Sequence, residues 1–519
     1  MVIVCGVLTG LNKGAFKNCS NLISFTFPDG IVSIGAHVFE DCTNLEQPGI
    51  PDSIAYIGDD AFKGCEKISC EEYDGSHYMG NENNPYVVLL DIPDKTVSSF
   101  AFHKNTRLIG NGVFDGCENL TEITLPDGIT GIGDRTFRNC GKLTEIILPD
   151  TLSRIGSEAF SGCASIGSIT LGSGLDRIDD MAFRDCDQLI EIINNSSLGL
   201  TAGSDDHGAI AYRALSIKKG GKSDIASYRN YTFLDGVNGV YMIAYTGEGS
   251  ALTLPDGYKG KSYILHDRVF DHNDRLVSVS IPDKVTAIGD YAFRSCSELK
   301  VITLPDSVTS IGDSAFLECS SLMRATIGSG VTAIGASAFA SCQKLIDVTI
   351  AGNPEEIGKE AFIGCIKLKN FSVKGNLGNI GFKAFASCVS LTDLTVGGKI
   401  GSIGSGAFAD CKSLTKLVLP EGLTSIGTYA FLNCSALTEI VLPEGLTEME
   451  DGVFQGCSSL ATVTIPAGMT KICKYPFFEC VSLSTIRYNG TMAQWRKLEE
   501  DNSLHYDPTV NVICSDGTL

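Results

Sequence analysis

A step of 23 residues recurs along almost the whole chain and constrains its fold more than any other feature. The stretch Leu120–Lys142, LTEITLPDGITGIGDRTFRNCGK, is one complete unit. Its most regular marker is a Phe followed three residues later by a Cys, as in Phe137 and Cys140. Repeats with periods of about 20 to 50 residues are typical of solenoids, which grow by adding coils rather than separate cores. One extended solenoid can therefore account for most of the 519 residues.

The marker Phe occurs in seventeen units, and sixteen of these also carry the Cys, because Asn273 replaces it once. A series this regular predicts that both side chains fill fixed positions inside each coil. The marker residues are Phe16, Phe39, Phe62, Phe114, Phe137, Phe160, Phe183, Phe270, Phe293, Phe316, Phe339, Phe362, Phe385, Phe408, Phe431, Phe454 and Phe477.

Each unit predicts one coil with a strand and a return. The alternating segment Ile146–Leu148 indicates a short strand with one buried face, and Pro149–Asp150 ends it. Gly156 is expected to give the backbone freedom at a tight bend. Phe160 and Cys163 have helical spacing, which predicts a single helical turn on the outer side. We therefore expect an α/β solenoid with a parallel β-sheet on the concave face and short helical turns on the convex face.

The 23-residue step is interrupted twice, after Phe62 and after Phe183. Turn dipeptides such as Asn238–Gly239 between alternating segments predict β-hairpin inserts at about residues 66–99 and 190–262. Inserts on solenoids often mark the binding face, so both are predicted to contact a partner.

The ends of the chain differ from the repeat. Stepping back one unit from Phe25 reaches Val2, so Met1 opens inside a coil with no polar cap before it. We expect that a missing upstream segment or another chain covers this coil; the oligomeric state stays open. Around Trp495 the pattern changes to a short helix and a last strand. The sequence predicts a solenoid over residues 1–485 and a C-terminal cap over 486–519.

The composition excludes several classes of partner. The net charge of -21 argues against nucleic acid, which requires a basic surface. No run of about 20 apolar residues occurs, so no membrane insertion is expected. The N-terminus lacks the basic leader and long apolar stretch of a signal peptide.

The chemistry-bearing residues have structural explanations. The Cys series raises the alternative of a metal or disulfide ladder, but a single file supplies no set of four convergent ligands. A row of turn carboxylates raises the alternative of calcium, which needs six to eight oxygens around one point. Metal-dependent chemistry at His266–Asp274 or Asp205–His207 is a further alternative. We predict no catalytic, cofactor or metal site. The turn carboxylates are Asp127, Asp150, Asp283, Asp306, Glu421 and Glu444.

The residues that alternate with the buried ones on the predicted strands form the candidate concave binding face. Many are Thr, which suits an exposed β surface, and no stripe of Trp, Tyr and Arg marks a hot spot. A binding role for this face is an expectation from the solenoid fold. The candidate residues are Glu122, Thr124, Glu145, Thr303, Arg324, Thr326, Asp347, Thr349, Asp393, Thr395, Lys416 and Glu439.

The unit C-x-x-L-x-x-[IV]-x-[IL]-P-[DE]-[GS]-[ILV]-T-x-I-G-x-x-A-F-x-x-C resembles the BspA-like, or Treponema pallidum-type, leucine-rich repeats. The resemblance covers nearly the entire chain and implies a curved leucine-rich-repeat solenoid. It also implies a bacterial cell-surface or secreted protein that adheres to host proteins or other cells. We therefore expect a non-enzymatic protein that binds a protein or glycan ligand. The alternatives are a structural spacer, a cytoplasmic interaction scaffold and a metal-dependent enzyme.

Overall fold

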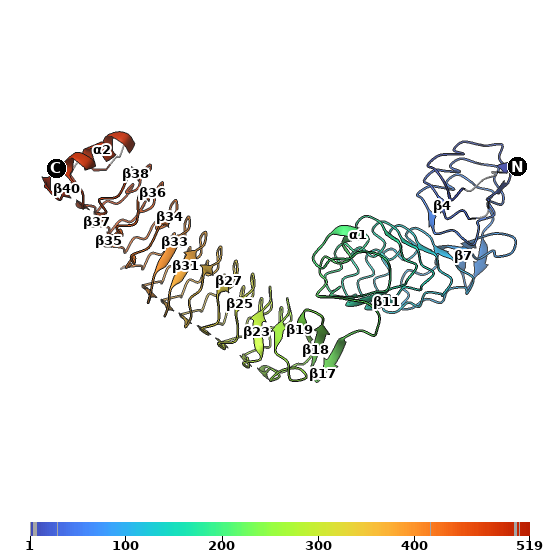
Figure 1. The fold of residues 1–519 in the computed structure, drawn as a ribbon, viewed down its shortest axis with the longest axis horizontal. Coiled ribbons are helices and arrows are strands. Elements are labelled where there is room, and N and C mark those ends of the chain that lie inside the picture. Colours follow the sequence, from blue (N-terminus) through green and yellow to red (C-terminus); the bar gives the residue numbers. More distant parts are fainter. Residues whose placement is uncertain (1, 4–7, 29, 416, 503–505, 508) are drawn as a thin grey trace. The chain divides into compact units, whose positions relative to one another are not determined.

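The computed structural model describes residues 2–3, 8–28, 30–415, 417–502, 506–507 and 509–519 (Figure 1). Its contacts separate into two compact units. Unit 1 comprises Met1–Ile225 and Gly236–Asn238, and unit 2 comprises Ala226–Asp235 and Gly239–Leu519. Both are built from stacked coils whose strands pair in parallel, which confirms the solenoid fold.

Most coils contribute two strands rather than the one that the sequence predicted. The first ladder holds the strands at the [IV]-x-[IL] positions, such as β28 (Asp347–Ile350) between β26 (Arg324–Ile327) and β30 (Asn370–Val373). The second ladder holds short strands that end at the Ile of the x-I-G motif, such as β27 (Ala333–Ile334). Paired residues in both ladders are one repeat apart, so the period read from the sequence is also the strand register.

In unit 1 the first ladder is interrupted by the first insert. Its strands are β1 (Val2–Ile3), β3 (Phe25–Thr26), β11 (Glu145–Ile147), β13 (Ser168–Leu171), β15 (Glu191–Asn194) and β16 (Ser216–Lys218). The second ladder and the strands joined to it are β2 (Gly10–Leu11), β4 (Ser33–Ile34), β5 (Tyr56–Ile57), β6 (Glu71–Tyr73), β7 (Ser76–Met79), β8 (Val88–Asp91), β9 (Leu108–Ile109), β10 (Gly131–Ile132), β12 (Arg154–Ile155) and β14 (Arg177–Ile178).

In unit 2 both ladders run through many consecutive coils (Figure 1). The first-ladder strands are β20 (Ala251–Thr253), β22 (Ser278–Ser280), β24 (Val301–Leu304), β26, β28, β30, β32 (Asp393–Val396), β35 (Glu439–Val441), β37 (Thr462–Ile465), β39 (Thr485–Tyr488), β40 (Asn511–Cys514) and β41 (Gly517–Thr518). The second-ladder strands are β18 (Tyr231–Gly236), β19 (Gly239–Tyr245), β21 (Tyr263–Leu265), β23 (Val285–Ile288), β25 (Ser310–Ile311), β27, β29 (Glu356–Ile357), β31 (Leu377–Ile380), β33 (Ile400–Ile403), β34 (Ser425–Ile426), β36 (Glu448–Met449) and β38 (Lys471–Ile472). Strand β17 (Ile225–Tyr228) crosses the boundary between the units.

The marker Phe side chains of consecutive coils stack on one another, and most of them are buried. The ring of Phe339 lies 4.9 Å from Phe316 and 5.1 Å from Phe362, with interplanar angles of 9° and 3°. All three side chains are fully buried. Centroid spacings in this range suit stacked aromatic rings, so each coil both packs on its neighbours and places the next ring.

The return segment is a hydrogen-bonded turn rather than the helical turn that the spacing predicted. Ser314 and Glu318 both have left-handed φ values, 54° and 61°, which no helix of L-residues sustains. The backbone N–H groups of Ser314, Phe316 and Glu318 donate to carbonyls of the following coil at 2.7–2.9 Å. The N–H groups of the return thus form hydrogen bonds between coils. In a helix the same groups would bond within the helix.

The Gly of the x-I-G motif serves close packing rather than the backbone freedom that we expected. Gly156 does not have a positive φ. A Cβ on Gly156 would lie 2.7 Å from the backbone nitrogen of Asp134, in the preceding coil. The carboxylate of Asp134 also accepts the N–H of Ser157 at 2.8 Å. The position is restricted to Gly because the two coils approach each other there.

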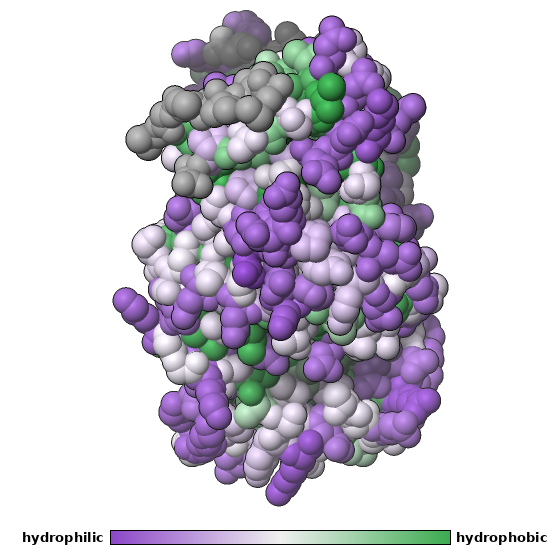
Figure 2. Space-filling view, turned by 90° about the vertical axis from the view of Figure 1, so that its right-hand side faces the viewer, coloured by the Kyte–Doolittle hydropathy of each residue, from purple (hydrophilic) through white to green (hydrophobic). Residues whose placement is uncertain are grey.

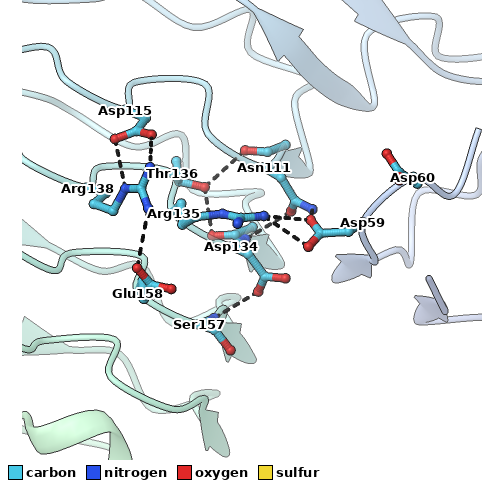
Figure 3. A network of polar contacts seen from close by, with 12 residues as sticks. Asp59, Asp60, Asn111, Asp115, Asp134, Arg135, Thr136, Arg138, Ser157 and Glu158 are labelled. Atoms are coloured by element: carbon cyan, nitrogen blue, oxygen red, sulfur yellow. Dashed lines mark hydrogen bonds and ion pairs between the residues drawn. The ribbon is translucent and has the colours of Figure 1, made fainter. Parts of the chain in front are cut away.

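The coils before the first insert pack against the coils that follow it (Figure 3). Tyr56 donates to Asp134 at 3.2 Å, and Arg135 pairs with Asp59 at 2.9 Å. Gly131 lies at the centre of this contact, where a Cβ would be only 1.9 Å from the carbonyl oxygen of Ala55. This packing joins residues that are 76 and 78 positions apart in the sequence.

The second insert continues the first ladder of unit 1 as β16 and contains the single-turn helix α1 (Asp206–Ala209). Its loop covers the side chain of Glu191, which is fully buried. Glu191 accepts from Ser168 at 3.0 Å and from the N–H of Asp224 at 2.8 Å, and Lys218 lies 3.3 Å away. A buried carboxylate needs such partners, so this end of the ladder is closed by the insert.

The C-terminal residues form the helix α2 (Met492–Asn502) and the strands β40 and β41. Thr491 and Gln494 form a reciprocal capping box at the start of the helix, with hydrogen bonds of 2.8 and 3.3 Å. Trp495 is fully buried and donates to the hydroxyl of Tyr506 at 3.3 Å. The proposed C-terminal cap over 486–519 therefore has an apolar anchor of its own.

Candidate functional site

Two parallel rows of polar side chains lie on the outward face of the first ladder in unit 2. Seven predicted binding residues fall on consecutive strands here and are exposed or half-buried. The charged row begins at the apolar Val301 and continues, in ladder order, with Arg324, Asp347, the neutral Asn370 and Asp393. The hydroxyl row is Thr303, Thr326, Thr349, Ser372 and Thr395.

Neighbours within each row contact one another across the strands. Arg324 lies 3.8 Å from Asp347, and Asn370 donates to the other carboxylate oxygen of Asp347 at 2.7 Å. Ser372 donates to Thr349 at 3.4 Å. The charges are thus held in a fixed order along the ladder, although an exposed pair of this kind contributes little to stability.

The remaining predicted face residues are separate from this group. Glu122, Thr124 and Glu145 are exposed in unit 1, and Glu439 begins β35, which belongs to a different sheet from β32. Lys416 lies outside the described residues. The structure therefore brings together seven of the twelve residues that the sequence singled out.

Apart from the exposed Cys19, the Cys series is buried and hydrogen-bonded to the backbone. The thiol of Cys342 donates to the carbonyl oxygen of Phe316 at 3.2 Å, and that of Cys365 donates to Phe339 at 3.1 Å. The same bond recurs in most coils, and every cysteine that the structure describes is a free thiol. Each thiol acts as a small core side chain that satisfies a carbonyl of the preceding coil.

Because these thiols are buried, we expect the chain to lose stability in alkaline solution. Burial raises the pKa of Cys365 from its ordinary value of 9.0 to about 12, whereas the unfolded thiol ionises near its ordinary value. The contribution of this thiol to the free energy of unfolding is therefore fully present below pH 9. It is lost as the pH rises from 9 towards 12. One such thiol contributes a loss of about 2 kcal/mol at a pH about 1.5 units above the unfolded pKa. Urea unfolding at several pH values between roughly 8 and 10.5 measures how steeply the free energy of unfolding falls with pH. In Cys365→Ala the slope should be smaller, and an unchanged slope would contradict the assignment.

The acidic and histidine clusters join neighbouring coils. Asp150 accepts the backbone N–H of Ser173 at 2.7 Å, and this bond is the main cause of its lowered pKa. In the other cluster His272 lies 2.8 Å from Asp271, which also pairs with Arg294 at 2.7 Å. Among the described residues, no group of three or more His, Cys, Asp or Glu side chains is arranged to hold a metal ion.

A groove of about 840 Å³ lies between the first coils of unit 1 and the first insert. One wall comes from β3 and the segment Glu46–Asp52, and the other from β6, β7 and the loop after β7. Asn81 fixes the loop by donating to the carbonyl of Ile50 at 2.8 Å, and Asn84 donates to Asp52 at 2.9 Å. The volume is within the usual range of ligand sites, about 300–1,000 Å³. Sequence reasoning singled out the insert but missed this groove.

The groove begins where the first ladder stops. Gln47 pairs with Ser24 on one side, and none of the described residues pairs with Gln47 on the other. Pro48 and Gly49 occupy the strand position of this coil, and Pro cannot donate a ladder hydrogen bond. This Pro–Gly pair is the sequence signal that could have located the groove.

The groove walls carry one sign of charge. The lining residues include four exposed carboxylates, those of Glu46, Asp52, Glu71 and Glu82. The described lining residues include no Lys, Arg or His. Lys67 lies 3.9 Å from Glu46 and is itself exposed. The face visible in Figure 2 is mostly hydrophilic, with hydrophobic side chains in small separate patches. Charge therefore distinguishes the groove more than apolar area does.

No helix in the described part of the chain has the length and apolarity needed to cross a membrane.

Comparison with known families identifies the repeat. The BspA type leucine-rich repeat region matches residues 7–78, 94–201, 264–392 and 378–498, with six copies. A search of curated proteins finds no significant match.

Several solved structures are similar to this chain. A leucine-rich repeat protein from Bacteroides ovatus is 22% identical, with 86% of this chain and 97% of that chain covered and a TM-score of 0.39. A T. pallidum leucine-rich repeat protein is 21% identical, with 55% and 98% covered and a TM-score of 0.25. A leucine-rich cell surface protein from Faecalibacterium prausnitzii is 19% identical, with 97% and 89% covered and a TM-score of 0.19.

Proposed function

Since the chain belongs to the BspA-type leucine-rich repeat family, we propose that it is a non-enzymatic surface protein that binds a protein or glycan partner. The outward face of the first ladder in unit 2 is the proposed contact surface. Repeat solenoids commonly bind through such extended faces. The proposal includes adhesion to host or microbial cells and display at the cell surface or secretion.

One observation carries the proposal. The charged row and the hydroxyl row present side chains on five consecutive strands, with each pair of neighbours one strand apart. The core of each coil is filled by its inward residues, so the outward residues are free to differ between coils. At equivalent positions Arg324 is cationic whereas Asp347 and Asp393 are anionic, and such differences give a face its specificity.

Charge reversal on this face should weaken binding to cells. We expect Asp347→Lys with Asp393→Lys to reduce the binding of the fluorescently labelled full chain to cultured epithelial cells and to gut bacteria. The expected loss is about tenfold in apparent affinity, since each altered charge contact is worth roughly 0.2–1 kcal/mol. Flow cytometry over a series of protein concentrations measures it.

A matched control carries the same change in net charge elsewhere in unit 2. Glu298→Lys with Glu356→Lys alters two exposed carboxylates that belong to neither row. This variant should bind as the parent chain does. Pretreating the cells with protease or with glycosidases separates a protein partner from a glycan partner. Unchanged binding of the Asp347 and Asp393 variant, or equal losses in both variants, would refute the proposed surface.

A further inference from the structure

We propose that the groove beside Gln47 binds an extended peptide segment of a partner protein that carries Lys or Arg side chains. This inference rests on the proposed binding function, but it concerns a different surface in unit 1. Three independent features of the groove support it: its shape, its open strand edge and its charge.

The shape of the groove suits a chain segment. The groove runs between two walls, β3 with Glu46–Asp52 on one side and the first insert on the other. Phe25 and Tyr78 are fully or almost fully buried beneath its surface and belong to opposite walls. Since Asn81 and Asn84 hold the loop against Ile50 and Asp52, the opening is a built feature of unit 1.

The open strand edge favours a peptide over a glycan. The first ladder ends at Gln47, which no described strand pairs with on its far side. The open edge is short, because Pro48 has no N–H and the N–H of Ile50 already donates to Gly80 at 3.0 Å. An extended peptide can add to such an edge through main-chain hydrogen bonds, while its side chains provide specificity. First-ladder strands further along the chain are already paired on both sides, as β28 is with β26 and β30.

The charge of the groove selects the side chains of the peptide. Four exposed carboxylates line the walls, and no cationic side chain is among the described lining residues. The hydrogen bonds from Asn81 and Asn84 hold the carboxylate of Asp52 without neutralising its charge. A groove lined with one sign of charge attracts the opposite charge, and Lys or Arg at alternate positions would present their charges together on one face of the extended peptide.

The test uses the full chain and two synthetic peptides. A fluorescein-labelled decapeptide of alternating Thr and Lys is the probe, and the same peptide with Glu in place of Lys is its control. We expect saturable binding of the Lys peptide by fluorescence anisotropy and none of the Glu peptide. Glu46→Lys with Glu82→Lys should weaken binding about tenfold, because it removes two attractions and adds two repulsions.

Two controls identify the source of the binding. Glu298→Lys with Glu356→Lys changes the net charge of the chain equally and should leave binding of the Lys peptide unchanged. A Lys peptide in which every backbone nitrogen is methylated keeps its charge but cannot donate hydrogen bonds along the strand edge, and it should bind more weakly. Equal losses in both charge variants, or undiminished binding of the N-methylated peptide, would overturn the proposal.

The outcome is separable from that of the proposed function. If the Glu46 and Glu82 variant retains cell binding while the Asp347 and Asp393 variant loses it, the first-ladder face is the binding surface and the groove is not needed. If the Lys peptide fails to bind the parent chain, the groove proposal is wrong whatever the cells show.

Discussion

Phe339→Ala should destabilise unit 2 by about 3–5 kcal/mol, the usual cost of emptying a buried Phe position. The ring is fully buried and stacks between Phe316 and Phe362 at 4.9 and 5.1 Å. Neighbouring coils cannot collapse into the space, because the hydrogen bonds of both ladders and of the returns fix their spacing. Urea unfolding followed by circular dichroism measures the loss.

The position of the substitution affects how unit 2 unfolds, because each coil contacts mainly its two neighbours. A cavity in the middle of the stack weakens two interfaces between coils, and the unit should then unfold in a broader or two-step transition. The matched control is Phe382→Ala, which removes the same side chain from an exposed position in the same unit. It should change the free energy of unfolding by no more than about 0.5 kcal/mol. Similar losses in the two variants would show that the stack does not support unit 2 in this way.

Gly131→Ala should loosen the contact between the coils before the first insert and those after it. The new Cβ would lie 1.9 Å from the carbonyl oxygen and 2.6 Å from the carbonyl carbon of Ala55, so the two backbones must separate. Forcing one extra methyl group into a packed site costs about 1–3 kcal/mol, and more where backbone must move. The hydrogen bonds from Tyr56 to Asp134 and from Arg135 to Asp59 would be strained or lost.

Hydrogen exchange locates this effect as well as measuring it. Amides of residues 54–59 and 130–135 should exchange faster in Gly131→Ala, while those of the distant coils keep their rates. Gly141→Ala is the control, because its Cβ would meet no atom within 4 Å and its φ is not positive. That variant should be neutral or slightly more stable. Normal exchange over residues 54–59 in Gly131→Ala would mean that the contact is not part of the stable fold.

The fold could be predicted from the sequence because its information is repeated. Seventeen copies of one pattern gave the period, and the period is also the register of both ladders. Phe339 and Cys342 could be assigned to the core, since each fixed position has a packing explanation. The return was predicted less well, because its two left-handed residues carry no common sequence signal: Ser337 and Ser341 adopt them in one coil, and Glu360 and Gly364 in the next.

The candidate surfaces were predicted only in part. Alternation on the strands identified Thr326 and Asp347 as outward residues, because a strand has a period of two. It could not show that Lys218, Ser223 and Asp224 return to cover Glu191, since that contact joins residues 23 or more apart through an irregular loop.

The sequence by itself determined the coil: its length, its buried residues and the order in which copies stack. Only the tertiary structure decided what happens where the copies are interrupted. Gly131 precedes the Ile of the x-I-G motif in its coil, and only the structure shows that Ala55 lies against it. The groove beside Gln47 likewise depends on how the first insert folds back along the coils. The physical reason is the range of the contacts: within the repeat each coil contacts the next at a fixed spacing, whereas an insert brings together residues that no period relates.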